Sequence, residues 1–251
     1  SMGLLWIVDH YRSKRRNIAY VIALFIFTLI VAMGVSTSIR NMAWMDEKTF
    51  WEDAVQKAPL SMRPVHNLAY YFYEKQGQYQ QAFELYHKAL ALKGYSRIQL
   101  SLPHIKIAEY YERSGAFDKA VEHLDKALGI FPGFERVQYR LAQALSRTAD
   151  LERALGIIKP LVTRHPNSYD CNYLMAQILL KVGQSGDALL QLRHCLRLSP
   201  DSARALFMTG IALNLDGNWQ ASEKFLQAVL DRYPNDKHAL LWMIDCRLRK
   251  L

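Results

Sequence analysis

The sequence predicts an all-α chain, in which an apolar helix near the N-terminus precedes an α-solenoid of five helical repeats with a capping half-repeat at each end. Three observations predict this fold class. Small side chains, turn residues and terminal prolines recur in phase over most of the chain. Residues 18–35 contain no charged side chain. Hydrophobic residues make up 51% of the 251 residues, with only 12 glycines and 8 prolines, a composition that favours a large buried interface over long disorder.

The block 101–134 displays the repeated pattern most clearly. Ala108 and Ala120 are small enough for two helix backbones to approach closely. Gly115 permits a tight turn between them, and Pro132 cannot continue a helix. The block therefore predicts a helix, a turn, a second helix and a stop.

Four further blocks carry the same spacing, so the array spans residues 63–234. They begin at Arg63, Glu135, Tyr169 and Ala203, and the first has one extra residue before its turn glycine, Gly77. The terminal prolines of successive blocks are 34 residues apart, from Pro132 to Pro234. With this period, the chain from about Pro59 to its end resembles the tetratricopeptide repeat (TPR) family, which implies stacked helix pairs that bind proteins or peptides.

Two features depart from that family pattern. No block carries the early tryptophan of the full signature. Pro160 lies inside a predicted second helix, where it is expected to remove a hydrogen bond and kink the helix.

The N-terminal region predicts a membrane anchor. Ser1 and Met2 are interpreted as an expression remnant within a basic cytoplasmic segment, residues 1–17. The apolar run from Ile18 to Ile39 is long enough to cross the hydrocarbon core and predicts a transmembrane helix. A cleaved signal peptide ending near 32–38 and a buried core helix are the alternatives.

The basic residues predict the orientation of this helix. Four cations precede it (Arg12, Lys14, Arg15 and Arg16), whereas Arg40 alone follows it at once. Because basic loops stay in the cytoplasm, we expect the N-terminus to be cytoplasmic and the repeats periplasmic or otherwise non-cytoplasmic.

Residues 40–62 form the junction and an N-terminal capping helix. Trp44 and Trp51 suit a membrane–water interface, and Asp46 with Glu47 suit the first turn of a helix. The stretch RNMAWMDEKTFWEDAVQKAP, which leads to Arg63, resembles the junction between the last span and the repeats in bacterial proteins similar to transmembrane O-mannosyltransferases. That resemblance implies a missing multi-span catalytic part.

The start GLLWIVDHYRSKRR resembles the end of an earlier span followed by a short loop, which agrees with a larger parent protein. A natural N-terminus with a single-span anchor remains the alternative. At the other end, residues 235–251 predict a capping helix that begins at Asn235. Leu240, Met243 and Ile244 share one face, and basic residues solvate the other.

The sequence offers no catalytic constellation. It contains no HExxH, CxxC, phosphate-binding glycine loop or GxSxG motif. The eight histidines and three cysteines are scattered among repeat positions, so neither a metal site nor a disulfide framework is expected. Because these motifs and ligand clusters are missing, we expect no cofactor and no enzymatic activity in this chain. The net charge of +9 is dispersed without a basic stripe, so we expect no nucleic-acid partner.

The concave wall of stacked helix pairs is the predicted binding surface. In TPR proteins it is lined by first-helix positions two, five, nine and twelve, which share one helical face. The predicted peptide-binding residues are Arg63, His66, Tyr70, Tyr73, Glu109, Arg136, Tyr139, Gln143, Tyr173, Gln177, Arg204, Phe207 and Asn214. The same face also carries Leu102, Ile105, Glu112, Ser146, Asp170, Leu180 and Ile211.

Aromatic rings beside arginines and amides are typical of peptide recognition, because they combine flat apolar area with hydrogen-bond donors. For Tyr73 and Tyr139, packing between helices is an equal alternative; for Arg136 and Arg204, a solvated charge is the alternative.

Two functional hypotheses follow from the sequence. The first is a membrane-anchored scaffold that binds a protein or peptide partner on the non-cytoplasmic side. The second is the acceptor-positioning tail of a membrane glycosyltransferase whose catalytic part lies outside this chain.

Overall fold

The computed structural model describes residues 2–92 and 96–249, and side chains from Ile18 onward except residues 19, 43, 73–74 and 97–98. The described residues form helices and connecting turns without a β-strand, as the sequence predicts. The chain divides into two compact units, residues 1–85 and residues 86–251.

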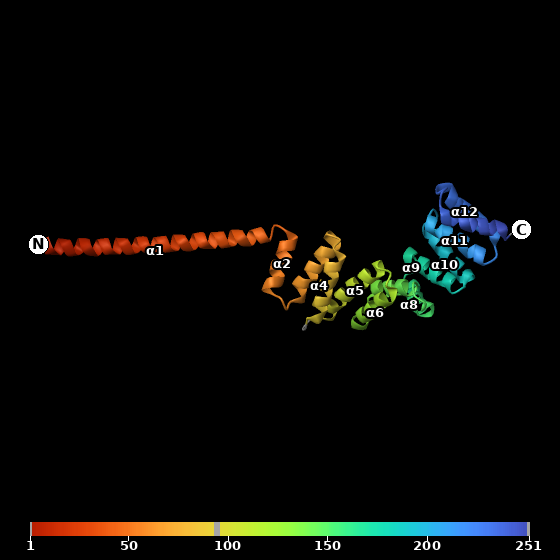
Figure 1. Cartoon of the computed structure of the whole chain (residues 1–251), viewed down its shortest axis with the longest axis horizontal. Coiled ribbons are helices and arrows are strands. Elements are labelled where there is room, and N and C mark those ends of the chain that lie inside the picture. The colour runs from red at the N-terminus through yellow and green to blue at the C-terminus, as the bar shows by residue number, and fades with distance from the viewer. Residues whose placement is uncertain (1, 93–95, 250–251) are drawn as a thin grey trace. The chain divides into compact units, whose positions relative to one another are not determined.

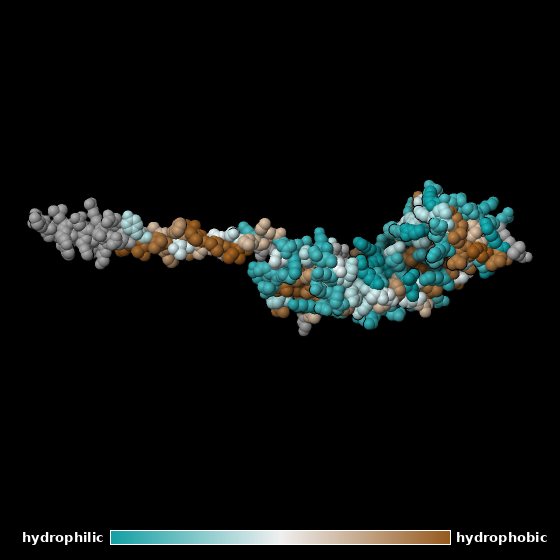
Figure 2. All heavy atoms as spheres, turned by 45° about the horizontal axis from the view of Figure 1, so that its top comes forward, coloured by the Kyte–Doolittle hydropathy of each residue, from teal (hydrophilic) through white to brown (hydrophobic). Residues whose placement is uncertain are grey.

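The first unit begins with a long helix whose apolar side chains are exposed. Helix α1 covers Met2–Ala43, and its segment Tyr20–Met42 has a mean hydropathy of 2.3 with none of its apolar window buried. Within the described chain, this is the one helix long and apolar enough to cross a membrane. Figure 2 displays these apolar side chains along the surface of α1.

Helix α2 (Glu47–Lys57) follows α1 after a short turn and packs against α3 (Met62–Tyr70). The Asp46 carboxylate caps α2 by accepting a hydrogen bond from the Thr49 backbone N–H at 3.0 Å. Trp51 is half-buried, whereas Trp44 is exposed. The rings of Trp44 and Phe50 are arranged edge to face, with their centroids 6.3 Å apart.

The extra residue of the first repeat is absorbed by a change of helix type. Helix α3 continues as a π-helix, η1 (Tyr71–Lys75), before the turn at Gly77 and helix α4 (Tyr79–Ala91). A π-helix adds one residue to a turn, so the insertion widens the helix locally and the next helix stays in phase.

The second unit consists of the end of α4, four complete helix pairs and the last helix, α13. Figure 1 shows the successive helices lying side by side, and from α5 onward each packs against the next along the chain. Their bounds are α5 Arg97–Arg113, α6 Phe117–Ile130, α7 Glu135–Leu145, α8 Leu151–Arg164, α9 Tyr169–Lys181, α10 Ser185–Leu198, α11 Ala203–Leu215, α12 Trp219–Arg232 and α13 Lys237–Leu248.

Side-chain caps set the starts of most first helices in this unit. Ser96, Ser168 and Ser202 each accept a hydrogen bond from the backbone N–H three residues later. Gly115, Gly183 and Gly217 then adopt positive φ in the turns between paired helices. In the third repeat Ala149 stands at this position, and no described non-glycine residue has positive φ, so that turn has a different geometry.

The core confirms the role of the small side chains. Ala108, Ala120, Ala142 and Ala154 are completely buried where paired helices meet. At Gly210 an added Cβ would lie only 2.8 Å from Leu226, so this position requires glycine for the helices to approach. Close packing of the repeats therefore depends on residues with little or no side chain.

Pro160 lies inside α8, which continues to Arg164. Because proline has no N–H, the carbonyl of the exposed Gly156 lacks its helical donor, and the expected kink stays a prediction. One sequence expectation needs correction. The last helix begins at Lys237 with Asp236 as its cap, not at Asn235.

The packing of α13 also differs from the expected face. Met243 is buried together with Ala239 and Cys246, whereas Leu240 and Ile244 are 41% and 54% exposed. Leu241 and Leu248 on the same helix are exposed as well, and Figure 2 shows apolar surface near the C-terminal end. Residues 240 and 244 of α13 are equivalent to residues 206 and 210 of α11, which lie 34 residues earlier. In α11 that face packs against the following helix, α12. Among the described residues, no helix covers this face of α13.

Candidate peptide-binding surface

The predicted residues of the first repeat lie on the first unit. Arg63 and Tyr70 are exposed on α3, and His66 is half-buried beside them. The side chain of Tyr73 lies outside the described residues. Arg63 and Tyr70 are therefore accessible, as a binding role requires.

Glu109 is engaged in an ion-pair network. It accepts from Lys106 at 3.0 Å and from Nη1 of Arg140, whose Nη2 donates to Glu112 at 2.7 Å. Burial raises the pKa of Glu112, against the lowering effect of Arg140. Because its carboxylate is already paired within the protein, Glu109 is poorly placed to recruit a cationic ligand.

Predicted tyrosines and arginines lie on α7, α9 and α11. Tyr139 and Tyr173 are half-buried, and the guanidinium of Arg204 lies 5.6 Å from the Tyr173 ring. Burial, with a smaller effect of Asp170, raises the pKa of Tyr139 to about 12, so its hydroxyl remains a donor at neutral pH. Each ring therefore packs partly against neighbouring helices and leaves part of its surface accessible.

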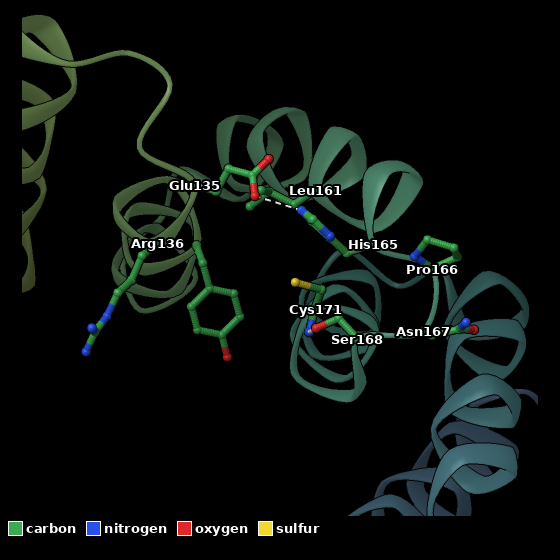
Figure 3. A pocket seen from close by; sticks show the side chains of 9 residues that line it. Glu135, Arg136, Leu161, His165, Pro166, Asn167, Ser168 and Cys171 are labelled. Carbon is green, nitrogen blue, oxygen red and sulfur yellow. Dashed lines mark hydrogen bonds and ion pairs between the residues drawn. The ribbon is translucent and has the colours of Figure 1, made fainter.

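A pocket of about 430 Å³ lies beside Tyr139. Figure 3 shows Glu135 and Arg136 on one side of it, with Ser168 and Cys171 of the next repeat on the other. The Glu135 carboxylate is hydrogen-bonded to His165 at 2.7 Å. The side chain of Arg136 is exposed and points away from the centre of the pocket.

Two further pockets join into a groove across the first helices. One, of about 360 Å³, is lined by Gln143, Ser146, Arg147, Gln177, Leu180, Lys181, Met208 and Ile211. The other, of about 300 Å³, is lined by Glu112, Phe117, Gln143, Ala144 and Arg147. Because they share Gln143 and Arg147, the two form one surface, which we call the first-helix groove.

The first-helix groove contains predicted residues and others that the sequence reasoning missed. Gln143 and Gln177 are in the predicted set, while Arg147, Lys181 and Met208 are not. A signal for the first two was present in the sequence, because residues 113, 147 and 181 are basic and lie 34 residues apart at the end of successive first helices. The helical-face rule omitted that position.

Two predicted residues at the C-terminal end differ in their exposure. Phe207 is half-buried and packs against the core formed by α12 and α13. Asn214 is only 1% exposed, and its amide donates to the Asp245 carboxylate and the Cys246 sulfur, each at 3.0 Å. The placement of Asn214 on the accessible wall was therefore wrong, because α13 covers that side of α11.

A pair of histidines packs between α5 and α6. The Nδ1 atoms of His104 and His123 are 3.1 Å apart, so one ring can donate to the other while the accepting ring is neutral, and the contact is lost when both are protonated. Burial lowers the pKa of both rings to about 4, with Lys126 and the neighbouring histidines adding to the effect. No group of three potential metal ligands occurs among the described residues.

Comparison with known proteins gives the family. Three family models described as tetratricopeptide repeat match residues 63–132, 112–178 and 173–237. The chain is built of tetratricopeptide repeats. Together the matches extend from the start of α3 to the start of α13, which agrees with the repeated helix pairs.

Several solved structures share this fold. YrrB, a TPR protein described as having an unusual peptide-binding site, is 20% identical, with a TM-score of 0.66 over 80% of this chain and 98% of that one. A TPR protein from Parabacteroides merdae is 17% identical, with a TM-score of 0.67 over 75% and 73%. A MamA fragment from Desulfovibrio magneticus is 14% identical, with a TM-score of 0.63 over 70% and 97%. No curated protein matches the chain.

Proposed function

We propose that this TPR protein is a membrane-anchored scaffold that binds a protein or peptide partner on the non-cytoplasmic side. The observation that carries the proposal is the first-helix groove, which crosses successive repeats and combines amides, cations and apolar side chains. Peptide recognition uses this combination, because main-chain groups need donors and acceptors while apolar side chains supply contact area.

The exposed apolar surface of α1 supports the anchor. An apolar helix of this length in water would expose its side chains at a large cost, whereas a bilayer solvates them and the helix satisfies its own backbone hydrogen bonds. TPR arrays generally act as scaffolds, and the sequence offers no set of residues for catalysis.

Partner capture tests the binding role. The full chain in detergent or nanodiscs is expected to lose most of its captured partners when Tyr139→Ala and Arg136→Ala are combined, because the pair removes an aromatic surface and an exposed cation beside the 430 Å³ pocket. The readout is quantitative mass spectrometry of captured proteins.

A matched control combines Tyr233→Ala with Arg193→Ala. It removes the same residue types from exposed positions, Arg193 on the second helix α10 and Tyr233 directly after the second helix α12. The control is expected to keep the wild-type partner set. Identical partner sets for wild type and the Tyr139/Arg136 variant would count against a binding role for the surface around these two residues.

Orientation has a separate test. We fuse after Leu251 a reporter that works only outside the cytoplasm. It is expected to be active, because the basic residues before the apolar segment of α1 favour a cytoplasmic N-terminus. Neutral replacements of Arg12, Lys14, Arg15 and Arg16 should reduce that activity. Activity of a cytoplasm-specific reporter at the same fusion point would reverse the proposed sidedness.

The glycosyltransferase-tail alternative depends on two resemblances, that of residues 40–59 and that of the start GLLWIVDHYRSKRR. The comparisons add no support for it over the scaffold. Reading the coding frame upstream of Gly3 decides it, because that proposal requires further membrane spans there.

A further inference from the structure

Two cations stand together in the first-helix groove. Arg147 follows the end of α7, and Lys181 is the last residue of α9; both line the 360 Å³ pocket. The Arg147 guanidinium lies 5.3 Å from the Phe117 ring, and the Lys181 ammonium donates to the Ser146 carbonyl. These contacts hold both positive charges at the groove.

Neither cation has an acidic partner among the described residues, which distinguishes them from their neighbours. Arg140 pairs with Glu109 and Glu112, and Arg153 pairs with Asp125 at 2.5 Å. Burial, together with repulsion from Arg147, lowers the pKa of Lys181. The groove therefore holds two mutually repelling charges at its accessible surface, and an anion bound between them would offset their repulsion.

The surroundings favour a peptide as the carrier of that anion. Leu180, Met208 and Ile211 supply apolar surface beside the cations. Gln143 and Gln177 occupy the same position on successive first helices, where their amides can donate to and accept from a peptide main chain. A nucleic acid would instead favour aromatic stacking and a longer basic track.

The groove's extent sets the length of the ligand. Its lining residues come from α5, α7, α9 and α11, together with Phe117 at the start of α6. Packed helices lie about 8–10 Å apart, and an extended peptide advances about 3.1 Å per residue, so roughly three residues span each step. A segment of about nine residues is long enough to cross the groove.

We propose that the first-helix groove binds an extended acidic segment of a partner protein, with a side-chain carboxylate held between Arg147 and Lys181. This inference rests on the proposed scaffold function and names the chemistry of its ligand. The guanidinium supplies paired donors to the carboxylate, and the ammonium supplies a point charge on its other side.

Labelled nonapeptides with both ends capped test the proposal by fluorescence anisotropy with the full chain in nanodiscs of neutral lipid. The three peptides carry two central glutamates, glutamines or lysines on one common backbone. We expect the glutamate peptide to bind at least about tenfold more tightly than the glutamine peptide, and the difference to shrink as salt is raised from about 50 to about 500 mM.

Variants locate the effect. Combining Arg147→Gln with Lys181→Gln is expected to reduce binding of the glutamate peptide to the level of the glutamine peptide, while Arg147→Lys retains part of the preference. The control Arg193→Gln removes a cation from the exposed face of α10 and should change affinity less than about twofold. Circular dichroism checks that each variant is folded; if the double variant unfolds, the salt dependence and the Arg147→Lys result decide.

Other outcomes overturn the proposal. Equal binding of the three peptides, no binding of any, or an unchanged preference in the folded double variant would each exclude an acidic-segment site. Tighter binding of a single-stranded RNA nonamer than of the glutamate peptide would also overturn it. The partner-capture experiment at Tyr139 and Arg136 is independent, so the scaffold function can stand when this inference fails.

Discussion

Ile158→Ala is expected to lower the free energy of unfolding by about 2–5 kcal/mol, the usual cost of deleting a buried aliphatic side chain. Ile158 is completely buried on α8, within a core that extends from α5 to α11. Truncation removes its apolar contacts and leaves a cavity that the neighbouring helices fill only partly. Urea unfolding of the full chain in detergent, followed by helical circular dichroism, measures the loss.

The loss at Ile158 should also spread to neighbouring repeats. Each helix pair is stabilised mainly by its neighbours, so a defect in the middle of the array weakens the interfaces on both sides. Leu190→Ala provides the control, because Leu190 is 51% exposed on α10 and its truncation is expected to cost less than about 0.5 kcal/mol. Equal unfolding midpoints for the two variants would contradict the packing described for α8.

Acidification is expected to destabilise the chain through the His104–His123 pair. The folded pKa of both rings is about 4, against an ordinary value of 6.5. Unfolded chains therefore bind protons below about pH 6.5, while the folded state resists protonation down to about pH 4. The contribution of the pair is complete above about pH 6.5 and is lost as the pH falls toward 4.

The environment of the pair sets the size of this effect. His87 from α4, Tyr111 from α5, and Glu122 and Lys126 from α6 surround the two rings. Full conversion of two such shifts would exceed 4 kcal/mol, but water reaches part of His104, so we expect a loss of about 2 kcal/mol between pH 7 and pH 4.5.

Comparison of variants isolates the pair from carboxylates that titrate in the same range. His104→Gln should flatten the dependence of unfolding free energy on pH, because one titrating ring is lost and glutamine can donate to His123. His238→Gln, at an exposed position on α13, serves as the matched control and should keep the wild-type slope. The same slope in wild type and His104→Gln would exclude the pair as its source.

Local pattern was sufficient to predict the helical repeats. Turn glycines at 115, 183 and 217 and small residues such as Ala108 and Ala120 mark the turns and close contacts that the structure contains. These features depend on backbone conformation and side-chain size, which are properties of single positions and their spacing. The extra residue in the first repeat was equally visible, although its accommodation in a π-helix was not.

Part of the binding surface was also predictable from helical spacing. The positions of Gln143 and Gln177 follow from the face of a first helix, and both line the first-helix groove. Arg147 and Lys181 were missed because they lie at the ends of their helices, outside the four positions of that face. The placement of Asn214 failed because a helix face can be covered by a later helix, here α13.

The sequence by itself therefore determined the helix pairs, their period and the apolar N-terminal helix, because each depends on residues close in the chain. Only the tertiary structure decided which groups meet: Arg140 with the carboxylates of α5, His104 with His123, and Arg147 with Lys181 without an acidic partner in the described chain. Charge and hydrogen-bond partners depend on distances between helices, and those distances are set by packing across repeats rather than by spacing within one.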